Sequence, residues 1–139
     1  MKTVWNFIQL AFSALGGFLG YFLGGLDGIL YALITFVVLD YLTGVMCAIN
    51  KHELSSTVGF TGICRKVLIF AFVGVGNILD MYILQNGSVF RSTVIFFYLS
   101  NEGISLLENA ATLGLPIPKK IKDILEQLYD KSNNESEDK

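Results

Sequence analysis

The sequence predicts an all-α integral membrane protein with four transmembrane helices, packed as two antiparallel hairpins, and a short amphipathic helix near the C-terminus. Hydrophobic residues make up 53% of the 139 residues and charged residues only 16%, whereas a soluble domain carries about 25% charged residues. The mean hydropathy is +0.55. The apolar residues are gathered in four runs joined by short polar segments. These observations favour a chain that folds in lipid.

The four runs occupy residues 4–25, 29–49, 67–84 and 89–113, within a membrane domain of residues 1–115. Each is close to the ~20 residues that a helix needs to cross a ~30 Å hydrocarbon core, and none alternates like a barrel strand. The short connections favour antiparallel neighbours. A three-span protein with a poorly inserted first run remains an alternative. The length of that run argues against a cleaved signal peptide.

The basic residues predict that both termini are cytoplasmic. Lys and Arg near span ends accumulate on the cytoplasmic side of a membrane, and with four spans only Arg91 falls outside. The residues that fix this orientation are Lys51, Arg65, Lys66, Lys119 and Lys120. We therefore expect a multi-pass protein whose C-terminus is cytoplasmic.

Glycines on the first two runs are candidate helix-packing residues. Gly16, Gly20 and Gly24 recur at four-residue spacing, and Gly44 lies in the second run. Small residues let membrane helices approach closely, and in lipid this packing replaces the hydrophobic effect. The stripe on the first run could receive the second run of the same chain, or it could form a contact between copies in a homo-oligomer.

The C-terminal part is expected to leave the membrane. Gly114 can end the fourth helix, and Pro116 and Pro118 prevent its continuation. Residues 116–130 have apolar residues at three-and-four spacing, which is typical of an amphipathic helix. This helix could lie on the membrane surface or a partner, or it could dock on the inner loop of its own chain. Residues 131–139 are expected to form a disordered, charged tail.

Acidic residues inside the predicted spans are the candidate functional residues; they are Asp40, Asp80, Glu102 and Glu108. A charge at the bilayer centre costs ~2.5–3.5 kcal/mol on insertion scales, so such acids usually face a partner or water. We expect Asp80 to pair with Arg91 near the outer end. Near the inner end, Glu108 is expected to pair with Arg65 or Lys66.

Asp40 and Glu102 lie at similar depth, near the middle of their runs, and no basic partner is expected there. Either both are protonated and hydrogen-bonded to polar neighbours, or they line a water-filled lumen. The sequence leaves both alternatives open. A proton relay has less support, because no chain of alternating acids, His and Lys is present. The candidate hydrogen-bonding neighbours are Thr43, Ser100, Asn101 and Ser105.

The sequence contains no motif for catalysis. It lacks a G-x-S-x-G elbow, a phosphate loop and an H-E-x-x-H pair. Cys47, His52 and Cys64 do not have the spacing of a zinc site, and no basic patch resembles a nucleic-acid footprint. We therefore expect a protein that is not an enzyme and that uses no cofactor, metal or nucleic acid.

Three sequence blocks occur in order between the predicted spans. The first comprises Asp40, Thr43-Gly44 and Arg65-Lys66; the second is Asn101-Glu102-Gly103; the third is Pro116-Ile117-Pro118 ahead of a Lys-rich helix. Together they resemble the phage holins of the toxin-secretion and phage-lysis family, which includes the holin-like protein encoded with large clostridial toxins. The resemblance covers about two thirds of the chain and leaves the first run outside it.

The resemblance implies a pore-forming protein of the bacterial cytoplasmic membrane. Such a protein contacts membrane lipid, assembles as a homo-oligomer and opens a lesion at a set time. The lesion lets an endolysin cause host lysis (cytolysis), or lets a toxin be secreted. Two other functions remain compatible with the residues: a small transporter or ion channel that uses the intramembrane acids, and a membrane scaffold that recruits a partner through the C-terminal helix.

Overall fold

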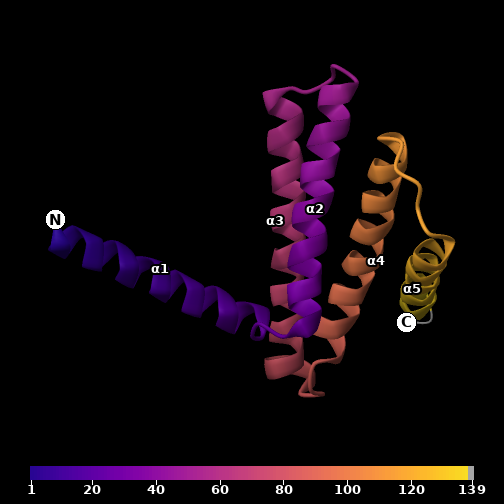
Figure 1. Ribbon diagram of the computed structural model, residues 1–139. Coiled ribbons are helices and arrows are strands. Elements are labelled where there is room, and N and C mark those ends of the chain that lie inside the picture. Colours follow the sequence, from indigo (N-terminus) through magenta and orange to yellow (C-terminus); the bar gives the residue numbers. More distant parts are fainter. Residues whose placement is uncertain (138–139) are drawn as a thin grey trace.

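The computed structural model describes residues 1–137 and consists of helices joined by short turns (Figure 1). In chain order these are α1 (Lys2–Leu23), α2 (Gly28–Asn50), α3 (Ser56–Ile78), η1 (Leu79–Leu84), α4 (Val89–Thr112) and α5 (Lys119–Glu137). The segment η1 is a π-helical continuation of α3. The all-α prediction is therefore confirmed for the part of the chain that is described.

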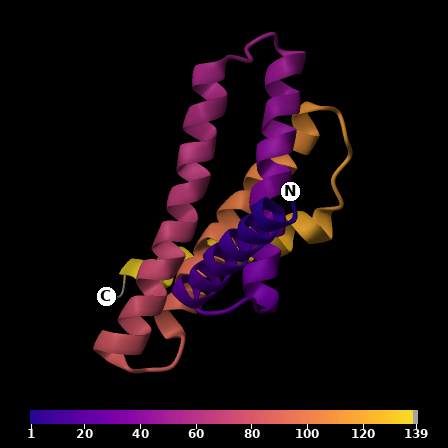
Figure 2. The same ribbon diagram turned by 90° about the vertical axis from the view of Figure 1, so that its left-hand side faces the viewer.

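The hydrophobic core lies between α2, α3 and α4. It is formed by Leu30, Leu33, Val37, Ile69, Val73, Ile95 and Leu99. The predicted hairpin of α3 and α4 is present, because these two helices are antiparallel and in contact (Figure 1). Helix α2 packs mainly on α4, whereas α3 and α4 diverge from the turn that joins them towards the other end of the bundle (Figures 1 and 2). The three helices therefore form a bundle that is tight at one end and open at the other.

Helix α1 projects sideways from this bundle (Figures 1 and 2), and none of its residues is buried. The predicted hairpin of the first two helices does not form, because α1 contacts α3 and not α2. Gly24 and Gly25 both adopt positive φ, 87° and 94°, a conformation that glycine allows. This turn directs α1 away from α2.

Helix α3 begins at Ser56, eleven residues before the predicted start at residue 67. The Ser55 side chain caps it by accepting a hydrogen bond of 3.2 Å from the Val58 backbone N–H. The prediction was wrong because it placed the span after the basic pair Arg65-Lys66, whereas Gly59 and Gly62 are already helical and lie against the Tyr41 side chain of α2. Lys66 therefore lies well inside a helix rather than at its end.

Among the described residues, three helical segments are long and apolar enough to cross a membrane: Lys2–Leu23, Gly28–Asn50 and Ser56–Leu84. Helix α4, with Arg91, Glu102 and Glu108, is not among them. The fourth membrane span thus remains a proposal.

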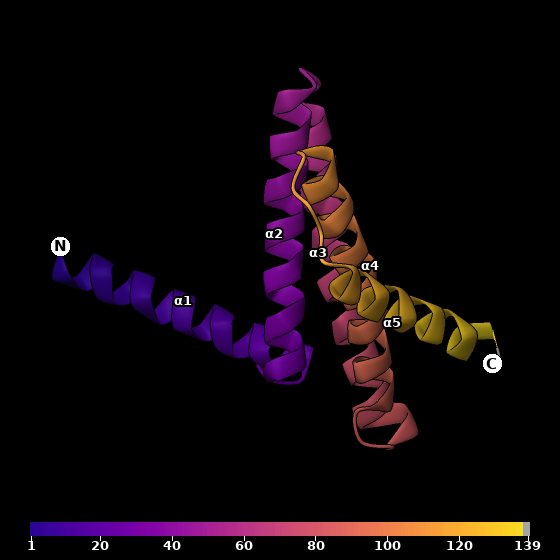
Figure 3. The same ribbon diagram turned by 45° about the vertical axis from the view of Figure 1, so that its right-hand side comes forward.

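Helix α5 crosses α4 on the side away from α1 (Figure 3). Its buried Leu125 packs against Gly103, where an added Cβ would come 2.9 Å from a Leu125 methyl carbon. The helix is thus docked on its own chain, on α4 rather than on the inner loop. It extends to Glu137, so the expected disorder is wrong for residues 131–137. Residues 138–139 lie outside the described part of the chain.

Candidate functional site: a charge cluster between three helices

Lys66 of α3 forms ion pairs with Asp40 of α2 and with Glu102 of α4. The three side chains are 18%, 8% and 10% exposed, respectively. Each residue lies ten positions from the same end of the bundle, counted from Asn50, Ser56 and Thr112. At 1.5 Å per residue this corresponds to about 15 Å. The cluster therefore lies about midway along helices of membrane-spanning length.

Asn109 extends the cluster towards the open end of the bundle. Its Nδ2 lies 3.0 Å from Asp40 Oδ1 and 3.0 Å from Thr43 Oγ1. Its backbone carbonyl accepts a hydrogen bond of 3.4 Å from the Cys47 thiol. An added Cβ on Gly44 would lie 3.8 Å from Asn109 Nδ2. The cluster and Asn109 thus connect α2 to α4 over two turns of helix.

The prediction that Asp40 and Glu102 have no basic partner is wrong. Their partner is Lys66, which lies ten residues inside α3 because this helix begins at Ser56 and not at the predicted residue 67. The similar depth of the two acids was predicted correctly. Of the expected hydrogen-bonding neighbours, Ser100 donates instead to the Phe97 carbonyl at 2.8 Å, and Thr43 donates to backbone carbonyls of its own helix.

A second charge cluster lies at the opposite end of the bundle. Arg91 Nη1 donates to Asp27 Oδ2 at 2.7 Å, and the same guanidinium donates to the carbonyls of Leu23 and Gly25. The expected side-chain pair between Asp80 and Arg91 does not form, because the Asp80 carboxylate accepts the backbone N–H groups of Phe90 and Arg91 at 2.9 and 2.8 Å. Asp80 therefore caps the start of α4.

Asp27 lies in the turn between α1 and α2, outside the spans. The hydrogen bond from Arg91 holds the pKa of the Asp27 carboxyl below its ordinary value of 3.8. Its Oδ1 also accepts the Leu30 backbone N–H at 3.0 Å, so Asp27 is the N-cap of α2. The turn between α1 and α2 is thus held by two charged side chains: Asp27, which lies in the turn, and Arg91, which comes from α4.

The other predicted residues are spread over the molecule. Glu108 lines a cavity with Lys122 rather than contacting Arg65 or Lys66. Gly16 and Gly20 face open space, whereas a Cβ on Gly24 would come 2.5 Å from Arg91 Nε. The remaining predicted residues lie outside both clusters: Lys51 ends α2, Arg65 is exposed on α3, Asn101 and Gly103 are on α4, Pro116 and Pro118 are in the link to α5, and Lys119 and Lys120 begin α5.

Asn109 belongs to the second block of the resemblance, together with Glu108, but no contact with Asp40 was predicted for it, and Asp27 was not identified as a binding residue. Asn109 lies seven residues after Glu102, a spacing that places both on one helix face. That spacing is the signal that could have identified it. Asp27 directly precedes a helix, which is the position that N-capping acids prefer.

Two cavities lie beside the main cluster, between α2 and α3. Their volumes are about 210 and 230 Å³, and both are lined by Tyr41 and Lys66.

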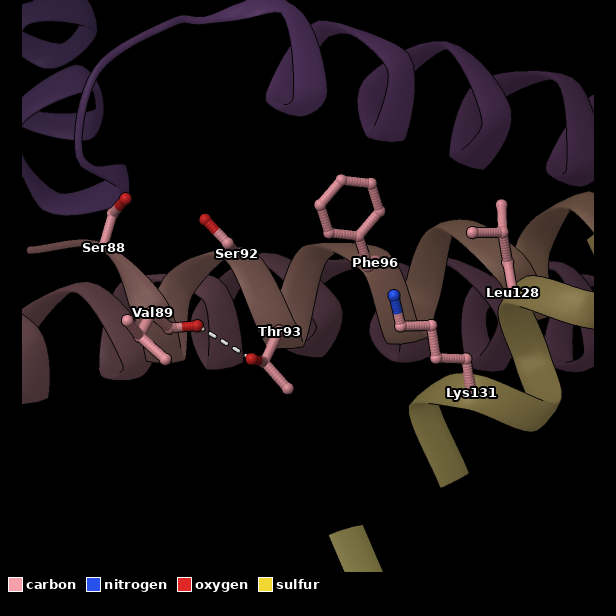
Figure 4. A pocket seen from close by; sticks show the side chains of 7 residues that line it. All are labelled: Ser88, Val89, Ser92, Thr93, Phe96, Leu128 and Lys131. Atoms are coloured by element: carbon pink, nitrogen blue, oxygen red, sulfur yellow. Dashed lines mark hydrogen bonds between the residues drawn. The ribbon is translucent and has the colours of Figure 1, made fainter. Parts of the chain in front are cut away.

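A third cavity, of about 460 Å³, lies between α4 and α5 (Figure 4). In Figure 4 the Thr93 hydroxyl donates to the Val89 carbonyl, and Lys131 of α5 reaches towards Phe96. Within the described residues, no three His, Cys, Asp or Glu side chains are placed to hold a metal ion.

The main cluster joins α2, α3 and α4 through ion pairs between side chains. It has two carboxylates and one ammonium group, so it carries a net charge of −1 when all three are ionised. Its ion pairs run only between side chains. Moving the helices apart would therefore expose charged groups along a path through the bundle without breaking any helical hydrogen bond.

Comparison with known proteins gives consistent similarities. A model of the bacteriophage holin family matches residues 17–130. The chain is 37% identical over 100 residues to a probable holin of Bacillus phage phi105, covering 72% of this chain and 73% of that protein. It is 42% identical over 132 residues to an uncharacterized 14.9 kDa protein of Clostridium perfringens, covering 94% and 99% of the two chains. It is 36% identical over 139 residues to an uncharacterized protein of Listeria monocytogenes, with 100% and 96% coverage. No solved structure shows significant similarity.

Proposed function

Because this chain belongs to the bacteriophage holin family, we propose that it is a regulated pore former, which permeabilises the cytoplasmic membrane to release an endolysin or a toxin. The observation that carries the proposal is the ion-paired cluster of Asp40, Lys66 and Glu102 between α2, α3 and α4. In this proposal the structure corresponds to the closed protomer, in which the charges satisfy one another.

Opening consists of separating the three helices at this cluster. Charged side chains within a membrane usually face a bundle interior or a water-filled cavity. In the closed protomer they face one another; in the open assembly they face water in a lumen formed by several copies. The closed cluster offers limited stabilisation, because the cost of desolvating buried ions offsets much of their attraction. The balance between the two states can therefore be close.

The membrane arrangement that suits this mechanism has four spans, with α1 turned across the membrane from the sideways position that it has in Figure 1, and with α4 shielded from lipid by its neighbours. The polar side chains of α4 are then directed to α2, α3 and other copies. The C-terminus is cytoplasmic, as the distribution of basic residues predicts. The protein acts as a homo-oligomer, because the lining of one protomer cannot enclose a lumen.

Induced expression in a bacterial host tests this proposal. Membrane potential and culture density are followed with and without a co-expressed endolysin that lacks a secretion signal. We expect abrupt depolarisation after a delay, and lysis only when the endolysin is present. The matched control is the same chain with a stop codon at Lys66, expressed from the same promoter.

Other outcomes would contradict the proposal in distinct ways. Continued growth at normal potential, with the protein confirmed in the membrane fraction, would exclude a pore former. Selective and saturable ion flux in a viable host would favour a channel or transporter instead. Lysis without endolysin would indicate a different lytic activity.

A further inference from the structure

The bundle has one apolar side and one polar side. Helices α2 and α3 expose large apolar side chains, including Val38, Leu42 and Phe72, and both are apolar enough to cross a membrane. Helix α4 is not among the apolar segments, and its exposed large apolar residues are Val89 and Phe96. The surface of α2 and α3 is therefore suited to lipid, whereas the side of α4 that carries α5 is not.

Helix α5 is docked on this polar side by a defined contact. The Leu125 side chain is buried, and an added Cβ on Gly103 would lie 2.9 and 3.1 Å from its two methyl carbons. A cavity of about 460 Å³ lies on either side of this contact, one lined by Phe96 (Figure 4) and the other by Glu108. Helix α5 therefore lies over the part of α4 between Phe96 and Glu108.

This docking places charged residues of α5 at the depth of the hydrocarbon core, if α4 spans the membrane. Gly103 lies nine residues from Thr112, the inner end of α4, and Phe96 lies sixteen; these separations correspond to about 14 and 24 Å. Charged side chains at such depth usually face a bundle interior or a water-filled cavity. Helix α5 is therefore expected to face water or another copy rather than lipid. Its exposed charged residues include Lys119, Lys120, Lys122, Glu126, Asp130 and Lys131.

From this geometry we propose that α5 closes the pore of the proposed function: docked on α4, it occupies the space between copies that becomes the lumen. Because α5 crosses α4 (Figure 3), it obstructs a passage that runs parallel to the bundle. Its 19 residues correspond to a length of about 28 Å, which is enough to extend across a passage between neighbouring bundles. Opening then requires α5 to leave α4.

The contact of Leu125 lies where α2 and α4 meet. An added Cβ on Gly103 would lie 3.1 Å from Phe36 of α2 as well as close to Leu125. Gly103 also directly follows Glu102, which pairs with Lys66. Separating α2 from α4 at the ion-paired cluster would therefore also open the site that Leu125 occupies, so the release of α5 is coupled to the opening of the bundle.

The segment that joins α4 to α5 allows this release. Residues 113–118 are not helical. Gly114 adopts a positive φ of 88°, and Pro116 and Pro118 keep the segment from continuing either helix. The segment can therefore carry α5 away from α4 while both helices stay intact.

A disulfide that holds α5 on α4 tests this inference. In a full-length chain with Cys47→Ser and Cys64→Ser, the substitutions Gly103→Cys and Leu125→Cys place two thiols at the contact, and the second removes the methyl carbons that the new Cβ would meet. Cells oxidised before the usual opening time should keep their membrane potential, and a reductant should depolarise them within minutes. The matched control carries Leu125→Cys without Gly103→Cys, and oxidation should not delay its depolarisation.

The opposite change releases α5. Leu125→Asp should shorten the delay before depolarisation at least twofold, because the buried contact on α4 is lost. Ile124→Asp is the matched control, because the Ile124 side chain is 48% exposed, and it should keep the wild-type delay. Trypsin cleavage at the lysines of α5, measured on membranes with the cytoplasmic face accessible, reports whether the helix has been released.

Two outcomes would overturn the inference alone. Oxidised cells that depolarise on schedule, with the disulfide confirmed, would mean that the pore opens while α5 stays docked. A wild-type delay in Leu125→Asp, with α5 released, would mean that α5 does not close the pore. The inference rests on the lumen of the proposed function, so a wild-type chain that never depolarises cells would overturn both.

Discussion

The two charge clusters of this protein differ in what they bind. At the end near α1, Arg91 and Asp80 contact backbone groups: the carbonyls of Leu23 and Gly25, and the N–H groups of Phe90 and Arg91. In the other cluster, Asp40, Lys66 and Glu102 contact one another through side chains on three helices. A cluster that binds helix ends fixes local backbone geometry. A cluster that binds only side chains can separate while every helix stays intact.

This difference assigns separate roles to the two ends of the bundle. The cluster around Arg91 is a structural anchor that joins α1, α2 and α4. In the proposed function, the cluster around Lys66 is the part that changes state. Mutations should therefore divide into those that disorder the turn next to α1 and those that alter the balance between closed and open bundles.

The largest effect is expected from Lys66→Met. This change leaves the Asp40 and Glu102 carboxylates facing each other without a cation, and removing one partner of a buried ion pair costs about 3–5 kcal/mol. Thermal unfolding in detergent micelles should show a large loss of stability. Arg65→Met is the matched control, because the neighbouring Arg65 is exposed, and it should unfold like the wild type.

The triple variant Asp40→Asn, Lys66→Met and Glu102→Gln shows whether the stability lost by Lys66→Met is due to the unpaired carboxylates. Replacing a whole buried ion cluster by neutral groups is often neutral or stabilising, so the triple variant should regain most of the stability lost by Lys66→Met. It should also change the delay before depolarisation in cells. A triple variant as unstable as Lys66→Met would mean that shape, and not charge, holds the three helices together.

The next largest effect is expected from Arg91→Lys. Lysine keeps the charge but cannot reproduce the guanidinium fork that binds Asp27 and two carbonyls. We expect a loss of roughly 1–3 kcal/mol, confined to the turn next to α1. Amide hydrogen exchange of residues 20–30 should accelerate, while exchange around Lys66 should not. Faster exchange throughout the bundle would contradict the separation of roles.

A smaller and local effect is expected from Leu125→Asp. Leu125 is buried against Gly103, and a carboxylate cannot be accommodated there without loss of packing. Helix α5 should detach from α4 and become sensitive to trypsin at its lysines. The control is Ile124→Asp, because the Ile124 side chain is 48% exposed. Equal sensitivity of the two variants would mean that α5 is not held by this contact.

The smallest effect is expected from acid. The pKa of Asp27 is lowered in the folded protein by Arg91, so the stabilisation from this pair is present above the ordinary carboxyl pKa of 3.8 and is lost as the pH falls through the lower folded value. The Asp27 side chain is 50% exposed, so solvent screens the pair. Hydrogen exchange of residues 20–30, corrected for intrinsic rates, should accelerate modestly below pH 4. Asp27→Asn should remove this pH dependence.

The helical class and the depth of the two central acids could be predicted because both depend on local patterns. Apolar runs define helices in lipid, and counting along a helix gives depth. Other features depended on contacts that no local pattern shows. The predicted start of α3 at residue 67 followed the basic pair Arg65-Lys66, whereas the helix begins at Ser56 and packs Gly59 and Gly62 against the Tyr41 side chain, which lies on another helix. That single error also concealed the partner of Asp40 and Glu102. The direction of α1 was not predictable either, because it depends on Asn77 and Arg91, which are distant in sequence.

An engineered disulfide that joins α2 to α4, and that a reductant can break, tests the central claim most directly. Thr43 and Asn109 face each other across α2 and α4, with Oγ1 and Nδ2 3.0 Å apart. In a chain with Cys47→Ser and Cys64→Ser, the substitutions Thr43→Cys and Asn109→Cys allow a disulfide to join these helices. If opening separates them at the cluster, oxidised cells should keep their membrane potential, and adding a reductant should depolarise them within minutes. Depolarisation of the oxidised cells on the wild-type schedule, with the disulfide confirmed, would contradict the account.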